Sequence, residues 1–142
     1  MAEVIPGKMR ALVLPAPGRH EIQEVPVPQP EAGEVLCKVR GVAICGSDPE
    51  ILRGDLAGKW PPAYPFIPGH EWSGQVVAVG PGVVNLKVGD AVAGQAHKGC
   101  GYCRNCLSGR YTICEHYGRP ETGQRHYGFI TQGAYAQYIA IS

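Results

Sequence analysis

Four of the chain's six cysteines lie in one short stretch, CGYCRNCLSGRYTIC, at residues 100–114. Gaps of two, two and seven residues separate its four thiols, Cys100, Cys103, Cys106 and Cys114. A two-residue gap lets a tight turn bring two sulfur atoms onto one ion, and zinc binds four thiolates in a tetrahedron. Four protein ligands leave no open coordination position. The spacing therefore predicts a structural zinc site rather than a catalytic one.

Disulfides and a redox-active thiol pair are the alternatives for such a cluster. Disulfides need an oxidising compartment, and a thioredoxin-type pair needs a βαβ setting that this β-rich sequence does not offer. Zinc modules that bind nucleic acid carry two separated cysteine pairs on a basic surface, whereas the net charge here is +1. Zinc explains the cluster better than either alternative.

A second group of chemically capable residues lies upstream, in CGSD (45–48) and PGHEWSGQVVAVGPGV (68–83). Cys45, His70 and Glu71 offer a thiolate, an imidazole and a carboxylate, which together could form an open zinc site. Taken singly, a cysteine at the end of a strand is usually a small buried apolar residue, and a His–Glu pair usually lies on the surface. Residue types and spacing alone leave this second site undecided.

The elements that must position these residues are mostly strands. Alternating or short apolar runs bounded by the 20 glycines and 13 prolines predict strands at residues 9–14, 20–28, 34–45, 71–80, 88–94 and 133–141. In the strand at 34–45, the alternation predicts one buried and one solvent-facing side, with Leu36 on the solvent-facing side and Cys37 as a core thiol. The sum is a mainly β fold, expected to be a distorted barrel.

Other segments interrupt the strands. Residues 47–54 predict a short helix capped by Ser47 or Asp48 and ended by Gly54. Residues 59–69 form a proline-rich loop, and residues 95–132 form a long irregular segment that a zinc site would organise. Trp60, Tyr64 and Phe66 could line a substrate pocket, but packing of the loop is favoured, since aromatic side chains bury large areas wherever they fall. A surplus histidine near the cysteine lobe could replace a zinc ligand, but four cysteines already fill the tetrahedron, so His97, His116 and His126 are expected at the surface.

The combination of motifs resembles the zinc-dependent medium-chain alcohol dehydrogenases. The stretch GHEWSGQVVAVGPGV is similar to that family's signature GHE-x2-G-x5-G-x2-V, which covers Gly69, His70, Glu71, Gly74, Gly80 and Val83. AICGSD, the four-cysteine lobe and GAYAQY follow the family's order, and CGSD favours its polyol and threonine branch. The resemblance implies a GroES-like catalytic domain over residues 1–142. That domain is a partly open β-barrel with short helices and a structural zinc lobe at about 95–118.

The resemblance also implies roles for individual residues. Cys45 and His70 would bind a catalytic zinc ion, and Glu71 would be a ligand or a close neighbour. Ser47 would relay the substrate proton, and Asp48 would orient the imidazole of His70. The implied reaction oxidises a primary or secondary alcohol to a carbonyl, with zinc as Lewis acid and hydride transfer to NAD or NADP.

The sequence departs from the family in ways that bear on activity. The family's cofactor-binding Rossmann domain is absent from these 142 residues, and GPGVVN (80–85) lacks the third glycine of a dinucleotide-binding motif. We therefore expect an incomplete domain that is inactive alone, with NAD or NADP bound only in the full-length enzyme. We expect the structural zinc site to be filled and the catalytic site to be empty or partly filled. The competing hypothesis is a stand-alone zinc-binding module with a structural or partner-binding role.

Composition limits the partners. The charge of +1 gives no reason to expect nucleic acid, and no apolar run approaches a membrane span. No secretory signal precedes MRALVL, so the expected location is the cytoplasm, where thiols stay reduced. The expected partner is a small alcohol or carbonyl compound, with a homo-oligomer as an open option.

Overall fold

The computed structural model of the protein describes residues 4–142. Its strands are β1 (Lys8–Ala16), β2 (Arg19–Pro26), β3 (Val35–Val42), β4 (Trp72–Val79), β5 (Ala91–Ala93), β6 (His97–Lys98), β7 (Arg125–His126) and β8 (Tyr138–Ile141). Its helical segments are α1 (Asp48–Arg53), α2 (Arg104–Leu107) and the 3-10 turns η1 (Tyr111–Ile113) and η2 (Pro120–Thr122). The fold is mainly β with short helices, as predicted. Within residues 4–142, no helix has the length and apolar character needed to cross a membrane.

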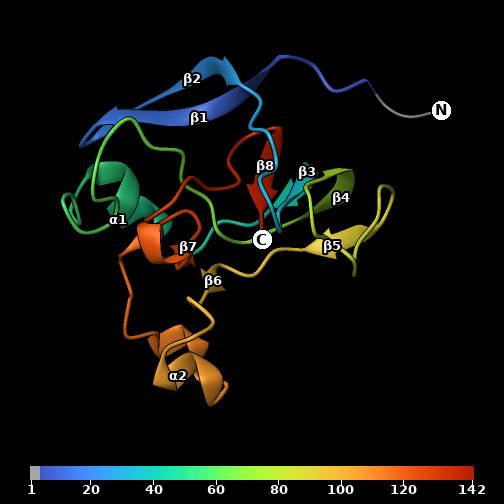
Figure 1. The fold of residues 1–142 in the computed structure, drawn as a ribbon. Helices are drawn as coiled ribbons and strands as arrows, with labels where there is room; N and C mark the ends of the chain where they lie inside the picture. Colours follow the sequence, from blue (N-terminus) through green and yellow to red (C-terminus); the bar gives the residue numbers. More distant parts are fainter. Residues whose placement is uncertain (1–3) are drawn as a thin grey trace.

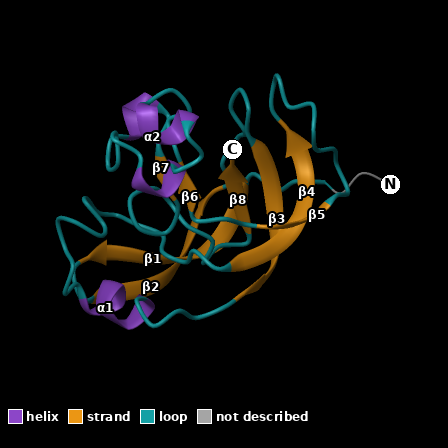
Figure 2. Ribbon diagram, turned by 90° about the horizontal axis from the view of Figure 1, so that it is seen from below, coloured by secondary structure: helices purple, strands orange, loops and turns teal. Residues whose placement is uncertain are grey.

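The strands form three antiparallel groups (Figure 1). β5, β4, β3 and β8 make a four-stranded sheet in that order, β1 pairs with β2, and β6 pairs with β7. The segment before β8 joins two of these groups, because the backbone N–H of Leu12 in β1 donates to the carbonyl of Tyr135, and that of Val39 in β3 donates to Gln137. The described strands thus curve around a shared core without closing (Figure 2), which confirms a partly open barrel.

Both faces of β3 are buried at its start, which corrects the prediction of one solvent-facing side. Val35 and Cys37 pack into one cluster with Trp72 and Val76, whereas Leu36 packs into a second cluster with Met9, Val27 and Tyr138. The second cluster exists because residues of the β1–β2 layer cover the other face of the strand. Cys37 is fully buried, as predicted, and burial raises the pKa of its thiol to about 11.

Helix α1 forms where the sequence predicted a helix. It ends at Gly54, whose φ of 80° suits glycine, and a Cβ there would meet Pro17. Ser47 occupies the N-cap position but makes no side-chain cap hydrogen bond. The last predicted strand is shorter than expected, because Ala134 and Tyr135 hydrogen-bond to Gly69 and Pro68 before β8 begins.

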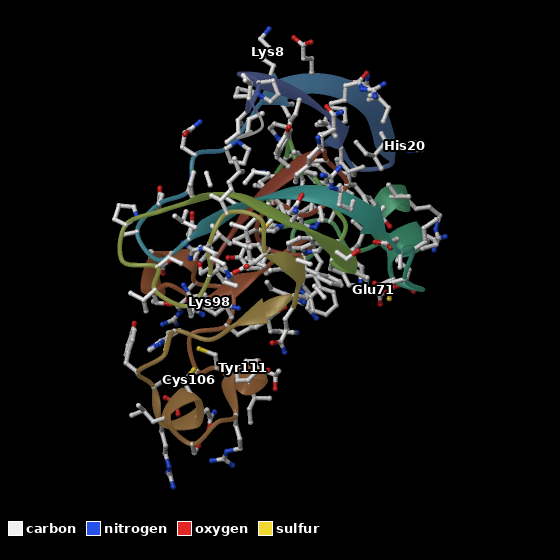
Figure 3. The ribbon with its side chains drawn as sticks, turned by 90° about the vertical axis from the view of Figure 1, so that its right-hand side faces the viewer. Lys8, His20, Glu71, Lys98, Cys106 and Tyr111 are labelled. Carbon is white, nitrogen blue, oxygen red and sulfur yellow. The ribbon has the colours of Figure 1, made fainter. Side chains whose placement is uncertain are left out.

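The segment after β6 forms a lobe that projects from the sheets (Figure 1). Figure 3 shows Cys106 and Tyr111 in this lobe, well apart from Glu71. Short elements that the sequence did not predict break up residues 95–132, namely β6, α2, η1, η2 and β7. Few of the lobe's large apolar side chains are buried: Tyr102, Leu107 and Ile113 are 57%, 75% and 57% exposed. The lobe therefore needs something other than an apolar core to hold it.

Candidate metal centres

Four sulfur atoms converge inside the lobe. The ligand atoms of Cys100, Cys103, Cys106 and Cys114 all lie within 4.8 Å of one another. Sγ of Cys100 lies 3.9 Å from Sγ of Cys106, and Sγ of Cys103 lies 3.9 Å from Sγ of Cys114. Zinc–sulfur bonds of about 2.3 Å in a regular tetrahedron give sulfur–sulfur edges of about 3.8 Å. The four thiols thus fit a zinc ion held by sulfur alone.

Backbone N–H groups point at these sulfur atoms. Cys103 N donates to Sγ of Cys100, and Cys106 N donates to Sγ of Cys103, each at 3.4 Å. Such bonds favour the thiolate form that a metal needs, and the one from Cys106 lowers the pKa of Cys103. Gly101 has a φ of 86°, a left-handed conformation that lets the chain curl around the cluster.

His116, which was expected at the surface, is only partly exposed and also faces the cluster. Its Nδ1 lies 3.3 Å from Sγ of Cys100, and its backbone N–H donates to Sγ of Cys114 at 3.4 Å. Burial raises the pKa of Cys100, but hydrogen bonds from the backbone of Tyr102 and from His116 outweigh this effect and lower the pKa to about 6. His116 lies two residues after Cys114, and Cys114 itself lies beside Cys100 in the cluster. His116 is therefore close to Cys100 although the two residues are 16 positions apart.

Strand pairing brings the second group together. β3 and β4 are antiparallel with Val42 opposite Trp72, and the N–H of Ala43 donates to the carbonyl of Glu71 at 2.9 Å. Cys45 follows β3 and His70 precedes β4, so the two side chains emerge at the same end of the sheet. Residues 25 positions apart in sequence thereby become neighbours.

Cys45, His70 and Glu71 offer ligand atoms that lie within 4.8 Å of one another. Nε2 of His70 lies 4.0 Å from Oε1 of Glu71, whereas Nδ1 of His70 lies 3.8 Å from Oδ1 of Asp48. His70 and Asp48 are buried, Cys45 is partly buried and Glu71 is exposed. Figure 3 shows Glu71 beside α1, at the edge of the molecule. The group is therefore buried on the Asp48 side and exposed to solvent on the Glu71 side.

Three buried polar atoms of Ser47, Asp48 and His70 are unpaired within the described part of the chain. Oγ of Ser47, Oδ1 of Asp48 and Nδ1 of His70 are buried, and none has a hydrogen-bond partner among the described residues. A small rotation of the imidazole ring would pair Nδ1–H with Oδ1 of Asp48, and Nε2 would then be the ring nitrogen left for a metal. A thiolate, an imidazole and a carboxylate suit zinc, and three protein ligands leave a position for another molecule. The residues fit an open zinc site.

Four aromatic rings form a column that ends at His70, and this row is called the aromatic column below. The rings of His97, His126, Phe129 and His70 follow one another with centroid distances of 3.9, 4.1 and 4.4 Å. His126 is only 5% exposed, so the prediction of a surface residue is wrong. β6 places His97 opposite His126, and the two rings stack. Burial, followed by the charges of His97 and His70, lowers the pKa of His126 to about 3.

The proline-rich loop packs against the column. Trp60 meets Phe129 edge to face at a centroid distance of 5.4 Å. Phe66 is buried in one cluster with Leu14, Ile51 and Phe129, and Trp60 and Tyr64 pack against that cluster. The prediction that these three aromatic residues serve packing agrees with this arrangement.

Sequence reasoning did not identify three contacts near the two centres. Tyr135 donates to Oδ2 of Asp48, Phe129 covers His70, and His116 faces Cys100. Only His116 had a local signal, its position two residues after Cys114. Tyr135 and Phe129 lie far along the chain from Asp48 and His70, so their contacts depend on the tertiary fold.

Comparison with known proteins gives a consistent result. Residues 31–142 match the family described as Alcohol dehydrogenase GroES-like domain. An alcohol dehydrogenase from Moraxella sp. (strain TAE123) is 38% identical over 135 residues, which covers 92% of this chain and 37% of that protein. An L-threonine 3-dehydrogenase from Francisella philomiragia subsp. philomiragia is 41% identical over 128 residues, which covers 88% of this chain and 34% of that protein.

A solved structure agrees as well. The cobalt- and zinc-bound thermostable alcohol dehydrogenase from Pyrobaculum aerophilum superposes with a TM-score of 0.81 at 34% identity, over 94% of this chain and 39% of that one. The chain thus spans between a third and two fifths of the length of these relatives. Since the family match covers most of the chain and the barrel and sulfur cluster agree with it, the chain belongs to the GroES-like domain family of zinc-type medium-chain alcohol dehydrogenases.

Proposed function

We propose that Cys45, His70 and Glu71 bind a catalytic zinc ion, and that the chain is the catalytic domain of a zinc-dependent alcohol dehydrogenase. The convergence of a thiol, an imidazole and a carboxylate within 4.8 Å carries this proposal. The proposed reaction is the oxidation of a primary or secondary alcohol to a carbonyl, with hydride transfer to NAD or NADP. The alcohol and threonine dehydrogenases among the relatives support this reaction class.

Each residue has a defined task in this proposal. Zinc held at the site supplies Lewis-acid polarisation of an alcohol or carbonyl oxygen. Asp48 would accept the Nδ1–H of His70 after a small rotation of the ring, which would keep Nε2 free of a proton and directed at the ligand position. Ser47 has a buried hydroxyl without a hydrogen-bond partner among the described residues, two positions after Cys45, and we propose that it relays the substrate proton. The four-cysteine lobe has no open position and is proposed to be structural.

The domain organisation follows the relatives. We propose that residues 1–142 are the GroES-like catalytic domain, with the zinc lobe at about 95–118. We also propose that the nicotinamide cofactor binds to a Rossmann domain outside these residues, because the relatives are more than twice as long. The cytoplasm is the proposed compartment, since a tetrathiolate site requires reduced thiols.

Zinc stoichiometry of the purified chain tests the two metal sites separately. We expect about one tightly held zinc per chain, lost in Cys100→Ser, since four thiolates bind zinc strongly. Added zinc should occupy a second, weaker site that disappears in Cys45→Ser and His70→Ala but persists in the exposed control His20→Ala. Second-site binding that survives Cys45→Ser would contradict the proposal.

Catalysis is tested on the polypeptide encoded by the complete reading frame. We expect alcohol-dependent reduction of NAD or NADP, followed by the absorbance of the reduced nicotinamide, and its loss in His70→Ala. A protein that holds both zinc ions but reduces neither cofactor with any primary or secondary alcohol would favour the competing role as a structural zinc-binding module.

A further inference from the structure

Tyr135 makes a short hydrogen bond to the residue that faces His70. Its hydroxyl group lies 2.6 Å from Oδ2 of Asp48 and 3.4 Å from the carbonyl oxygen of Ala43. Tyr135 and Asp48 are 87 residues apart, and the bond joins the segment before β8 to the start of α1. Its length is typical of a hydroxyl group that donates to a carboxylate.

The backbone around Tyr135 is tied to the segment that carries His70. The N–H of Tyr135 donates to the carbonyl of Pro68 at 2.9 Å, and that of Ala134 donates to the carbonyl of Gly69 at 2.8 Å. The tyrosine ring lies so close to Gly69 that a Cβ on this glycine would come 2.5 Å from ring atom Cδ1. The tyrosine hydroxyl and the imidazole of His70 are thus held by the same stretch of chain.

The two oxygen atoms of the Asp48 carboxylate have different surroundings. Oδ2 accepts from the hydroxyl of Tyr135 and from the N–H of Cys45 at 2.7 Å, so it is fully engaged. Oδ1 is left without another partner among the described residues and faces Nδ1 of His70 at 3.8 Å. Burial, reinforced by the hydrogen bond to Asp48, raises the pKa of Tyr135 above its ordinary value. The hydroxyl therefore stays protonated and acts as a donor.

We propose that Tyr135 is a positioning residue for the Cys45–His70–Glu71 centre, acting through Asp48. It holds the carboxylate in the rotation that presents Oδ1 to His70, and this fixes the ring so that Nε2 faces the metal position. The inference rests on the proposed function, since it assumes that this centre binds a metal. Groups that orient a ligating histidine typically change metal affinity by about 10- to 100-fold. Because the Cys45 N–H also holds Asp48, the effect of Tyr135 should fall near the lower figure.

Cobalt(II) titration of the full chain tests this inference. The lobe is first filled with zinc, and cobalt is then added, so that the thiolate-to-cobalt absorption band reports binding at Cys45. We expect Tyr135→Phe to weaken cobalt binding by about tenfold, because phenylalanine keeps the ring against Gly69 and removes only the hydroxyl. Tyr64→Phe is the matched control, since its buried hydroxyl has no partner among the described residues. The zinc content of the lobe should stay unchanged in both variants, which controls for folding.

The possible outcomes separate the inference from the proposed function. Equal cobalt affinity in wild type and Tyr135→Phe, with a Cys45-dependent band in both, would overturn the role of Tyr135 and leave the metal site standing. Equal weakening in Tyr64→Phe would also overturn it, since a general loss of stability would then explain the effect. A wild-type chain without any band that Cys45→Ser removes would overturn the metal site and, with it, this inference.

Discussion

The phenolic oxygen of Tyr117 lies 2.6 Å from Nδ1 of His126 and 3.0 Å from Nε1 of Trp60. Indole N–H can only donate, so the Tyr117 oxygen accepts from Trp60 and its proton goes to His126. Nδ1 of His126 is then the acceptor, and the neutral ring carries its proton on Nε2. This network links the zinc lobe, the proline-rich loop and the aromatic column beside His70.

Tyr117→Phe should lower the free energy of unfolding by about 1–3 kcal/mol, because it leaves the half-buried indole N–H of Trp60 and the buried imidazole nitrogen of His126 unpaired. Urea denaturation of the zinc-loaded chain measures the change. Tyr64→Phe removes a buried hydroxyl that has no partner among the described residues, so it should be nearly neutral. Equal losses in the two variants would show that the Tyr117 network does not contribute to stability.

His126 should make stability fall with acid. Its pKa is lowered to about 3 in the folded protein, whereas an unfolded histidine titrates near 6.5. Between these values the unfolded state binds the extra proton, so the free energy of unfolding falls as pH drops, by at most about 1.4 kcal/mol per pH unit from this group. Above pH 6.5 the contribution is constant.

Unfolding free energies of wild type and His126→Gln, compared between about pH 5 and 7, check this dependence. The variant should show a shallower slope, whatever its absolute stability. The exposed His20→Gln should keep the wild-type slope. An unchanged slope in His126→Gln would mean that His126 has the same pKa in the folded and unfolded states.

Removal of zinc should loosen the lobe while the sheets persist. Its apolar side chains are largely exposed, so in the proposed zinc site metal–sulfur bonds would supply the stability that an apolar core gives elsewhere. With chelator and reductant present, trypsin should cleave after Arg104 and Arg110 at least about tenfold faster, as expected when local opening becomes easy. Mass spectrometry of early fragments identifies the sites, and zinc added back should restore protection. Unchanged cleavage after metal removal would show that the lobe folds without zinc.

Val76→Ala and Val84→Ala make the same chemical change in opposite environments. Val76 is fully buried in the main cluster, and Val84 is 96% exposed. The buried substitution should cost about 2 kcal/mol of unfolding free energy through lost burial and a small cavity. The exposed one should stay within about 0.5 kcal/mol. Chemical denaturation distinguishes them, and similar values would place Val76 outside the cooperative core.

Sequence alone was sufficient where structure is local. The convergence of the four sulfur atoms could be predicted because Cys100, Cys103, Cys106 and Cys114 fall within one short stretch, where the turns between cysteines set the sulfur positions. Gly54 could be predicted as the end of α1, because the left-handed conformation at a helix end favours glycine. The alternation of β3 predicted the burial of Cys37 but not that of Leu36, since a pattern cannot show that a second layer covers the other face.

Both the sequence and the tertiary structure were needed to identify the group of Cys45, His70 and Glu71. Cys45, His70 and Glu71 were ambiguous by residue type, and a family resemblance singled them out. Their closeness depends on the register of β3 against β4, which places Val42 opposite Trp72. A slip of one residue would turn the side chains of the strand to the opposite face. Strand pairing therefore decides whether Cys45, His70 and Glu71 meet.

The surroundings of the two centres were decided by tertiary structure alone. His126 seemed to be a surface residue, yet pairing of two-residue strands and ring stacking bury it. Tyr135 reaches Asp48 across 87 residues because the segment before β8 hydrogen-bonds to Pro68 and Gly69. Sequence spacing fixes which residues can share a turn, whereas contacts between distant segments depend on how strands pair and side chains pack. The candidate ligands could therefore be named from motifs and family resemblance, whereas the contacts of Tyr135 and Phe129 with Asp48 and His70 could not.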